Sequence, residues 1–177
     1  MPALWWWDEM TFKRSRGGSV YFAVSTMNVL EKNRQFKSSS AEAGGIMLGR
    51  LIAGTADIVV DEVVGPLSRD RRSRLAFYRP KKQTQQIVNQ AWQASHGTKI
   101  YLGEWHTHPE KSPTPSAKDL SNWKQICETA IYEQEYLLFL IVGHKSCRLW
   151  ELSNGNSLLE TIHIAFPKSP ATRCPKI

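Results

Sequence analysis

A strand-like segment that runs into two histidines, with a helix start soon afterwards, constrains this chain more than any other feature. Residues 99–105 favour a β-strand, and His106 and His108 follow it. Side chains two residues apart on a strand point to the same face, so both imidazoles can reach one point. Seven residues separate His108 from Ser116, and Asp119 lies three residues further on. A loop of that length can fold back and bring the start of a helix to the end of the strand.

This arrangement supplies the ligands of a catalytic metal site. Two imidazole nitrogens and one carboxylate leave a fourth tetrahedral position for water, which is typical of catalytic zinc. Such an ion lowers the pKa of its water toward about 7 and polarises a carbonyl group. The pair Ser116 and Asp119 also matches an ordinary helix-capping pattern, and a lone histidine near a strand end is commonly structural. The conjunction of all these features favours the metal site.

The rest of the chain alternates strand and helix patterns. Ser25 is a candidate cap for the first helix, Gly54 a candidate hairpin turn, and Gly97 a stop for the second helix, which is amphipathic. This order predicts an α/β (α+β) fold with a mixed sheet flanked by helices. The expected strands cover residues 20–24, 45–52, 57–64, 75–78, 99–105, 136–142, 147–152 and 158–166, and the expected helices cover residues 25–36, 82–95 and about 116–130.

Composition narrows the class of protein. The 177 residues suit one domain, which we expect at residues 1–166, with a flexible tail at residues 167–177. No apolar run of about 18–20 residues suggests a membrane span, and the N-terminus does not resemble a signal peptide, so a cytoplasmic location is expected. Three scattered cysteines suit reduced, packed thiols better than disulfides. They are Cys127, Cys147 and Cys174.

The net charge of +7 allows two interpretations. One is an acidic partner such as nucleic acid, and the other is a solvated basic surface. The excess lies in three short runs, at residues 13–16, 69–74 and 81–82. No nucleic-acid recognition motif or interleaved aromatic pattern accompanies these runs, so a nucleic-acid partner is not favoured.

At residues 106–119 the chain resembles a known family. His-Thr-His-Pro, the seven-residue gap and the Ser-Ala-Lys-Asp sequence together look like the JAMM motif of JAB/MPN metalloproteases. That motif also requires a glutamate just before a glycine-containing apolar strand, and Glu42, ahead of Gly44 and Gly45, matches it. The resemblance implies a curved mixed β-sheet flanked by helices, with cytidine-deaminase-like layering.

The resemblance also implies a role for each motif residue. His106, His108 and Asp119 would bind zinc. Glu42 would take a proton from the attacking water and pass it to the leaving amine. Ser116 would stabilise the tetrahedral oxyanion.

Other residues compete for these roles. Glu104 is a rival base, but we expect it to point away from the face that carries His106. Asp61 and Glu62 are rivals without positional support. The remaining histidines are expected to be ordinary surface or capping residues. The three consecutive tryptophans near the N-terminus are expected to belong to the core and to cover a sheet edge. These residues are His96, His144, His163 and Trp5 to Trp7.

Within the family, three features most resemble bacterial deconjugases of CBASS antiphage operons: the sequence of residues 42–49, the arginine-rich segment after Gly65 and Pro66, and the compact length. These deconjugases act where a cGAS-like nucleotidyltransferase (CD-NTase) is attached through its C-terminus to a target by ubiquitin-activating-like and ubiquitin-conjugating-like enzymes. The resemblance implies an isopeptidase that removes the CD-NTase. Two alternatives stay open: a peptidase that processes a ubiquitin-like sulfur-carrier protein, and an MPN scaffold without activity.

The segment at residues 67–80 is the candidate substrate groove. It combines a short β-prone run with several arginines, and an exposed strand edge can bind an extended tail by adding it as another strand. We expect Arg71 and Arg72 to favour negative charge on the partner, and Phe77 and Tyr78 to contact the tail. The alternative is a disordered basic loop.

Overall fold

The structure is a computed structural model that describes residues 10–37, 39–153, 155, 158–161 and 164–165. Several sequence predictions fall on residues outside these ranges. They concern Trp5 to Trp7, His163, Cys174 and the tail at residues 167–177.

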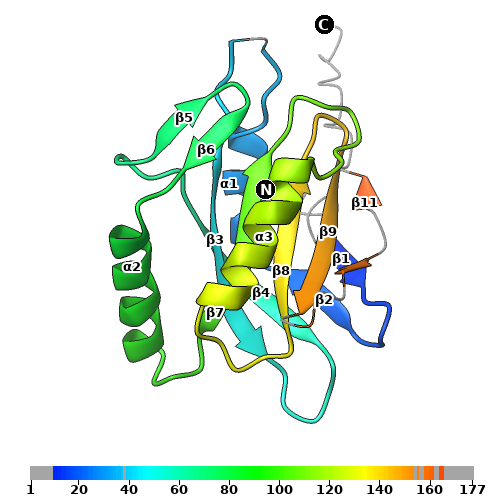
Figure 1. Cartoon of the computed structure of the whole chain (residues 1–177). Coiled ribbons are helices and arrows are strands. Elements are labelled where there is room, and N and C mark those ends of the chain that lie inside the picture. The colour runs from blue at the N-terminus through cyan, green and yellow to red at the C-terminus, as the bar shows by residue number, and fades with distance from the viewer. Residues whose placement is uncertain (1–9, 38, 154, 156–157, 162–163, 166–177) are drawn as a thin grey trace, which may run out of the picture.

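A curved mixed sheet of nine strands forms the centre of the described part (Figure 1). The strand order is β1-β2-β4-β3-β7-β8-β9-β10, with β11 paired to β9. The β2–β4 and β7–β8 pairs are parallel, and the other pairs are antiparallel. These strands are β1 (Met10–Lys13), β2 (Ser19–Phe22), β3 (Gly44–Leu51), β4 (Ile58–Val64), β7 (Ile100–Thr107), β8 (Tyr136–Val142), β9 (Ser146–Ser153), β10 (Leu158–Glu160) and β11 (Ile164–Ala165).

Two helices cover opposite faces of the sheet. Figure 1 shows α3 (Ala117–Thr129) in front of the sheet and α1 (Val24–Lys32) behind it. Met27 and Leu30 of α1 join one buried cluster, and Trp123 and Cys127 of α3 join the other. The mixed fold class with flanking helices is therefore confirmed.

The second helix, α2 (Lys81–Ala94), lies beside the sheet rather than across it (Figure 1). It has the predicted amphipathic pattern, but none of its residues is fully buried, and Trp92 is 54% exposed. Gly97 ends the helix as predicted. It has a φ of +82°, and its N–H donates to the Trp92 carbonyl at 2.8 Å. Among the described residues, no helix is long and apolar enough to cross a membrane.

The first helix differs from the prediction at both ends. Its N-cap is Ala23 without a side-chain cap, so the capping role predicted for Ser25 is wrong. The helix ends at Lys32, earlier than predicted, because the Asn33 side chain donates to the Val29 carbonyl at 2.8 Å. Gln35 beyond it is buried instead of continuing the helix.

The strand that carries the histidines, β7, lies in the middle of the sheet between β3 and β8. It extends two residues past the predicted end, so His106 and Thr107 belong to it. Gly103 lies in a bulged part of this strand with a φ of +144°, and a side chain there would collide with the Leu138 carbonyl. The central position of β7 fixes the histidines on a rigid element.

The short strands depart from the predictions in three places. β1 was not predicted. One strand was expected at residues 158–166, where the structure has β10 and β11 instead. The predicted run near residue 75 is β6 (Ala76–Tyr78), which pairs with the unpredicted β5 (Arg71–Ser73) to form a separate hairpin.

Candidate metal centre

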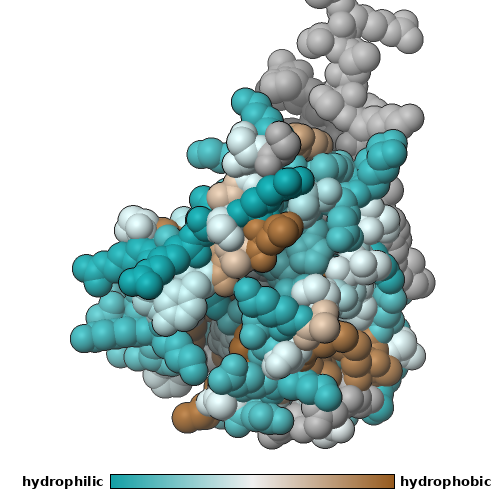
Figure 2. All heavy atoms as spheres, turned by 45° about the horizontal axis from the view of Figure 1, so that its top comes forward, coloured by the Kyte–Doolittle hydropathy of each residue, from teal (hydrophilic) through white to brown (hydrophobic). Residues whose placement is uncertain are grey.

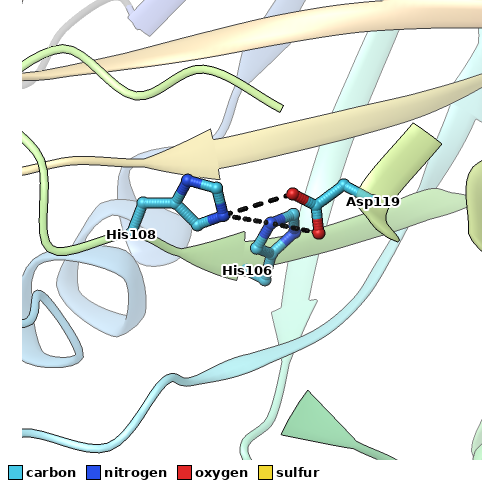
Figure 3. A group of neighbouring side chains, drawn as sticks. All are labelled: His106, His108 and Asp119. Carbon is cyan, nitrogen blue, oxygen red and sulfur yellow. Dashed lines mark hydrogen bonds and ion pairs between the residues drawn. The ribbon is translucent and has the colours of Figure 1, made fainter. Parts of the chain in front are cut away.

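Two histidines and one aspartate converge at the end of β7. His106 lies on the strand, His108 follows it, and Asp119 lies in the first turn of α3. Figure 3 shows the three side chains pointing toward one another. The Trp123 ring lies edge-on to the His106 ring at a centroid distance of 6.4 Å and stacks on Phe139 at 4.7 Å. The aromatic packing between α3 and the sheet thus supports one side of the site.

The distances within this group suit a common ligand. The two Nε2 atoms are 3.0 Å apart. Asp119 Oδ1 lies 3.3 Å from His106 Nε2, and Asp119 Oδ2 lies 3.4 Å from His108 Nε2. Ligand atoms about 2.0–2.1 Å from a tetrahedral zinc lie about 3.3–3.4 Å from each other. The donor set and its spacing therefore fit a small divalent metal ion with three protein ligands.

Asp119 is held by the helix start that the sequence predicted. The Ser116 side chain accepts from the Asp119 N–H at 3.2 Å, and Asp119 Oδ2 accepts from the Ser116 N–H at 2.7 Å and its hydroxyl at 2.6 Å. This capping box fixes the carboxylate while both its oxygens face the imidazoles. Capping and metal binding are thus compatible roles for one carboxylate.

The electrostatics of the group favour a charged Asp119. Burial opposes ionisation, but hydrogen bonds from His106, His108 and Ser116 outweigh it and hold the pKa of Asp119 well below its usual range. Burial also disfavours a charged His108, yet the Asp119 carboxylate more than offsets this and raises the pKa of His108. A negative carboxylate beside two imidazoles is the arrangement that attracts a cation.

The register of β3 against β7 places Glu42 beside this group. Gly44, the first residue of β3, lies opposite His106, and Glu42 stands two residues before it. Glu42 is 9% exposed, and burial raises the pKa of its carboxyl group. Positive charge on His106 and on His108 would oppose this rise in the Glu42 pKa. Glu42 therefore lies within electrostatic reach of the convergence point as a potential proton acceptor.

Glu104 does not lie where we expected. It stands two residues before His106 on β7, so it shares the face of His106, and the expectation of an opposite face is wrong. Its carboxylate is instead engaged by an ion pair with Arg79 and by a hydrogen bond from the Tyr101 hydroxyl at 3.3 Å. Glu104 thus lies on the face of β7 that a base would need, but its carboxylate is bound by Arg79 and Tyr101.

The other rivals lie in ordinary contacts. Asp61 pairs with Arg50 at 2.8 Å, and Glu62 pairs with Lys99 at 3.1 Å. His96 is exposed with a φ of 53° just after α2, and His144 Nε2 faces the Gln35 carbonyl at 2.8 Å. Among the described residues, the one group of acids, histidines and cysteines close enough to hold a metal is His106, His108 and Asp119.

The β5–β6 hairpin lies against the segment that carries Glu42. Arg72 Nε donates to the Glu42 carbonyl at 2.7 Å, and Ser73 accepts from the Glu42 N–H at 2.7 Å. A methyl group on Gly44 would lie 3.1 Å from Phe77 and 3.2 Å from His106 Cβ, so both side chains lie close to Gly44. Segment 67–80 thus contains a two-stranded hairpin, unlike the alternative of a disordered basic loop.

Arg71 and Tyr78 of the hairpin are exposed, Tyr78 at 62%. Figure 2 shows the face turned toward the viewer from the top of Figure 1, where the hairpin lies. Hydrophilic side chains cover most of this face, with smaller hydrophobic areas between them. The face seen in Figure 2 is thus mostly polar, with small apolar patches.

Several residues around the site were not predicted from the sequence. Glu110 Oε1 lies 3.8 Å from His108 Nδ1, on the side of the ring away from Asp119. Gln35 and Thr107 form a buried hydrogen bond of 2.8 Å. Proximity to the His-x-His sequence was a signal for Glu110 and Thr107, whereas Gln35 lies far from the motif in the chain.

Comparisons with known proteins agree with this geometry. Residues 32–153 match the model of a family described as prokaryotic homologs of the JAB domain. Curated relatives named "CD-NTase/cGAS isopeptidase" include one from Vibrio cholerae, 36% identical over 77% of this chain and 84% of its own length. Another, from Escherichia coli, is 37% identical over 78% of this chain and 85% of its own length. A third, from Pseudomonas aeruginosa, is 37% identical over 60% of this chain and 66% of its own length.

A solved structure supports the fold independently. The solution structure of protein DSY2949 from Desulfitobacterium hafniense has a TM-score of 0.52 at 20% identity, over 81% of this chain and 88% of that chain. The matched family region contains Glu42, both histidines of the HTHP sequence and Asp119. The chain belongs to the family of prokaryotic homologs of the JAB domain.

Proposed function

We propose that this chain is a zinc-dependent isopeptidase. The observation that carries the proposal is the convergence of His106, His108 and Asp119 within 4.8 Å, with the buried Glu42 beside them. When bound, zinc acts as a Lewis acid that activates water and polarises the carbonyl of the bond to be cleaved. His106, His108 and Asp119 would hold the ion, and no nucleophilic side chain is needed.

Glu42 acts as the general base and then as the general acid. It accepts a proton from the attacking water and delivers it to the leaving amine, so that water adds across the amide bond. Its buried position raises the pKa of its carboxyl group and brings it closer to the working pH of a base. The products are the free C-terminal carboxylate of one protein and the free amine of the other.

Ser116 is the proposed donor to the oxyanion. Its hydroxyl donates to Asp119 Oδ2 at 2.6 Å in the structure, so this role requires that the hydrogen bond be exchanged for one to the substrate. Ser116 is exposed at the start of α3, where a substrate carbonyl can approach.

The proposed substrate is a protein conjugate in which the C-terminal carboxyl group of a CD-NTase-like protein is joined to an amine of a target. The support is the name shared by the relatives from Vibrio cholerae, Escherichia coli and Pseudomonas aeruginosa. A conjugating system that makes this bond is the functional partner, and the setting is antiphage defence. The alternatives are processing of a ubiquitin-like sulfur-carrier protein and a scaffold without activity.

The substrate is tested with the purified zinc-loaded protein and two substrates. One is a CD-NTase-like protein joined through its C-terminus to a lysine of a target, and the other is a sulfur-carrier precursor with a C-terminal extension. We expect cleavage of the first, with both proteins released intact and identified by mass spectrometry. Cleavage of the precursor alone would support the processing peptidase, and cleavage of neither would support the scaffold.

The exposed Arg71 is expected to contribute to recognition of the conjugate. Arg71→Glu should raise KM for the conjugate by about two- to fivefold at low salt, the size of a surface charge interaction of up to about 1 kcal/mol. The difference should shrink as salt screens the charge, and kcat should stay near the wild-type value. Steady-state kinetics at low and high salt check this.

A short peptide substrate is the control for Arg71, since it lacks the protein surface that the arginine would contact. Its cleavage should not change in Arg71→Glu. An unchanged KM for the conjugate at low salt would remove Arg71 from the recognition surface. Arg72 is not tested in this way because it holds the Glu42 backbone, so its replacement would also affect kcat.

Phe77 and Tyr78 remain the proposed contacts of the substrate tail. Phe77 lies close to Gly44, the residue opposite His106 in the β3–β7 pairing, and Tyr78 is exposed next to Phe77 on β6. Adjacent residues on a strand point to opposite faces, so a tail that binds along the edge of this hairpin would meet one ring on each of its own two faces.

A further inference from the structure

A buried glutamine connects the parts of the chain that build the site. Gln35 follows α1 and is 1% exposed. Its Oε1 accepts from the Thr107 hydroxyl at 2.8 Å, and its Nε2 donates to the Ser40 carbonyl at 3.2 Å and the Arg74 carbonyl at 3.0 Å. A buried amide is costly unless its donors and acceptor are paired, and here each end is paired. These bonds fix the orientation of the Gln35 side chain.

Thr107 transmits this connection to the histidines. It lies between His106 and His108 and is fully buried. Its hydroxyl accepts from the Ala43 N–H at 2.9 Å, and its own N–H donates to the Ala43 carbonyl at 2.8 Å. The residue that follows Glu42 is therefore bonded through both its amide and its carbonyl to the residue between the two proposed ligands.

The hairpin holds the other side of the same segment. Arg72 donates to the Ala41 carbonyl at 3.3 Å and to the Glu42 carbonyl at 2.7 Å, and the Glu42 N–H donates to Ser73. Gln35 binds the Arg74 carbonyl on this hairpin as well. One side chain thus contacts segment 40–43, the hairpin and β7.

The Glu42 carboxylate depends on this backbone for its position. Among the described residues, no side chain forms a hydrogen bond or ion pair with the Glu42 carboxylate, whereas the backbone N–H and carbonyl of Glu42 are both hydrogen-bonded. A general base must lie about 2.6–3.2 Å from the atom whose proton it takes, or reach that atom through one water molecule. A small shift of segment 40–43 would therefore move the carboxylate out of reach.

We propose that Gln35 is a positioning residue that, through Thr107, Ser40 and Arg74, sets the place of Glu42 relative to the point where His106, His108 and Asp119 converge. This inference rests on the proposed function, because it concerns the base of that reaction. Gln35 acts through other residues and does not touch the substrate.

The test uses the full chain with Gln35→Met, which keeps the length of the side chain and removes its polar atoms, and Thr107→Val, which removes one hydroxyl. Both variants should lose about ten- to a hundredfold in kcat, the range expected for a misplacement of about 1 Å. KM and bound metal should stay at wild-type values. Amide hydrogen exchange at residues 40–43 should become faster, which is a readout independent of activity. Thr107→Ser keeps the hydroxyl and should restore kcat to within a few-fold of wild type.

Thr26→Val is the matched control. The Thr26 hydroxyl is also buried and donates to the Ala23 carbonyl at 2.6 Å, but it lies at the start of α1. Both Thr26→Val and Thr107→Val remove a buried, hydrogen-bonded hydroxyl, so both should lower thermal stability. Only Thr26→Val should keep the wild-type kcat. If Gln35→Met and Thr107→Val keep wild-type kcat, or if Thr26→Val loses as much, the positioning role is refuted.

Failure of the proposed function would look different. In that case the wild-type protein would bind metal and cleave none of the substrates offered. The exchange measurement would still decide whether Gln35 and Thr107 hold segment 40–43: unchanged exchange in both variants would refute the connection itself.

Discussion

Glu42→Gln is expected to retain zinc and fold but to lose about 10²–10⁴-fold in kcat, the usual contribution of a general acid–base group. The amide has the size of the carboxyl group but cannot accept the proton of the attacking water. Glu42 is not one of the three converging ligand residues, so the metal should remain. The measurement is kcat for cleavage of the conjugate, together with elemental analysis of the same sample.

Glu104→Gln is the matched control, since it removes a carboxylate from the same face of β7 two residues from His106. Glu104 is engaged by Arg79 and Tyr101, so its loss should change kcat by only a few-fold once the folded fraction is accounted for. A wild-type kcat in Glu42→Gln with a large loss in Glu104→Gln would place the base at Glu104 instead.

His106→Ala is expected to remove the metal and cleavage together. Three protein ligands leave little redundancy, and the loss of even an outer-shell partner typically weakens metal binding about 10–100-fold, so the loss of a direct ligand should exceed this. His108→Ala should behave in the same way, because both Nε2 atoms face Asp119 at 3.3 to 3.4 Å. Competition with a chelator of known affinity, followed by elemental analysis, measures the loss.

His96→Ala is the control for these substitutions. His96 is exposed just beyond α2 and belongs to no cluster of metal-binding groups among the described residues. It should keep the metal content and activity of the wild type. A His106→Ala protein that keeps a full complement of tightly bound metal would show that the ligands lie elsewhere.

The local part of the site could be predicted from sequence because its geometry follows from short-range spacing. Alternation along a strand and a capping pattern at a helix start are both set within a few residues. The distances among His106, His108 and Asp119 agree with that prediction. The fully buried strand β8 was also predicted with its exact bounds, because its apolar run is uninterrupted.

Other features depend on contacts between residues that are far apart in the chain, and no periodic pattern in the sequence reveals such contacts. Gln35 lies 72 residues from Thr107, and nothing in the local pattern marks either as part of one network. The early end of α1 depends on the Asn33 side chain, and the strand β5 is recognisable only once it pairs with β6. The face of Glu104 could have been predicted, since it needed only the same alternation applied to His106.

The substrate-recognition surface is the part of the proposed site that could be predicted least well from the sequence. An arginine-rich segment indicates positive charge, yet the structure divides its members: Arg71 and Arg72 are both exposed, but the guanidinium of Arg72 bonds to the backbone of the Glu42 segment. Residues in one run can thus have different roles, and each must be tested separately.

The metal content of the wild-type chain tests the central claim most directly. Protein purified without chelator should contain one zinc per chain by elemental analysis. Removal of the ion with a chelator should abolish cleavage of the conjugate, and one equivalent of zinc should restore it. Metal content near zero in a protein that still cleaves the conjugate, with no loss on chelation, would contradict the account.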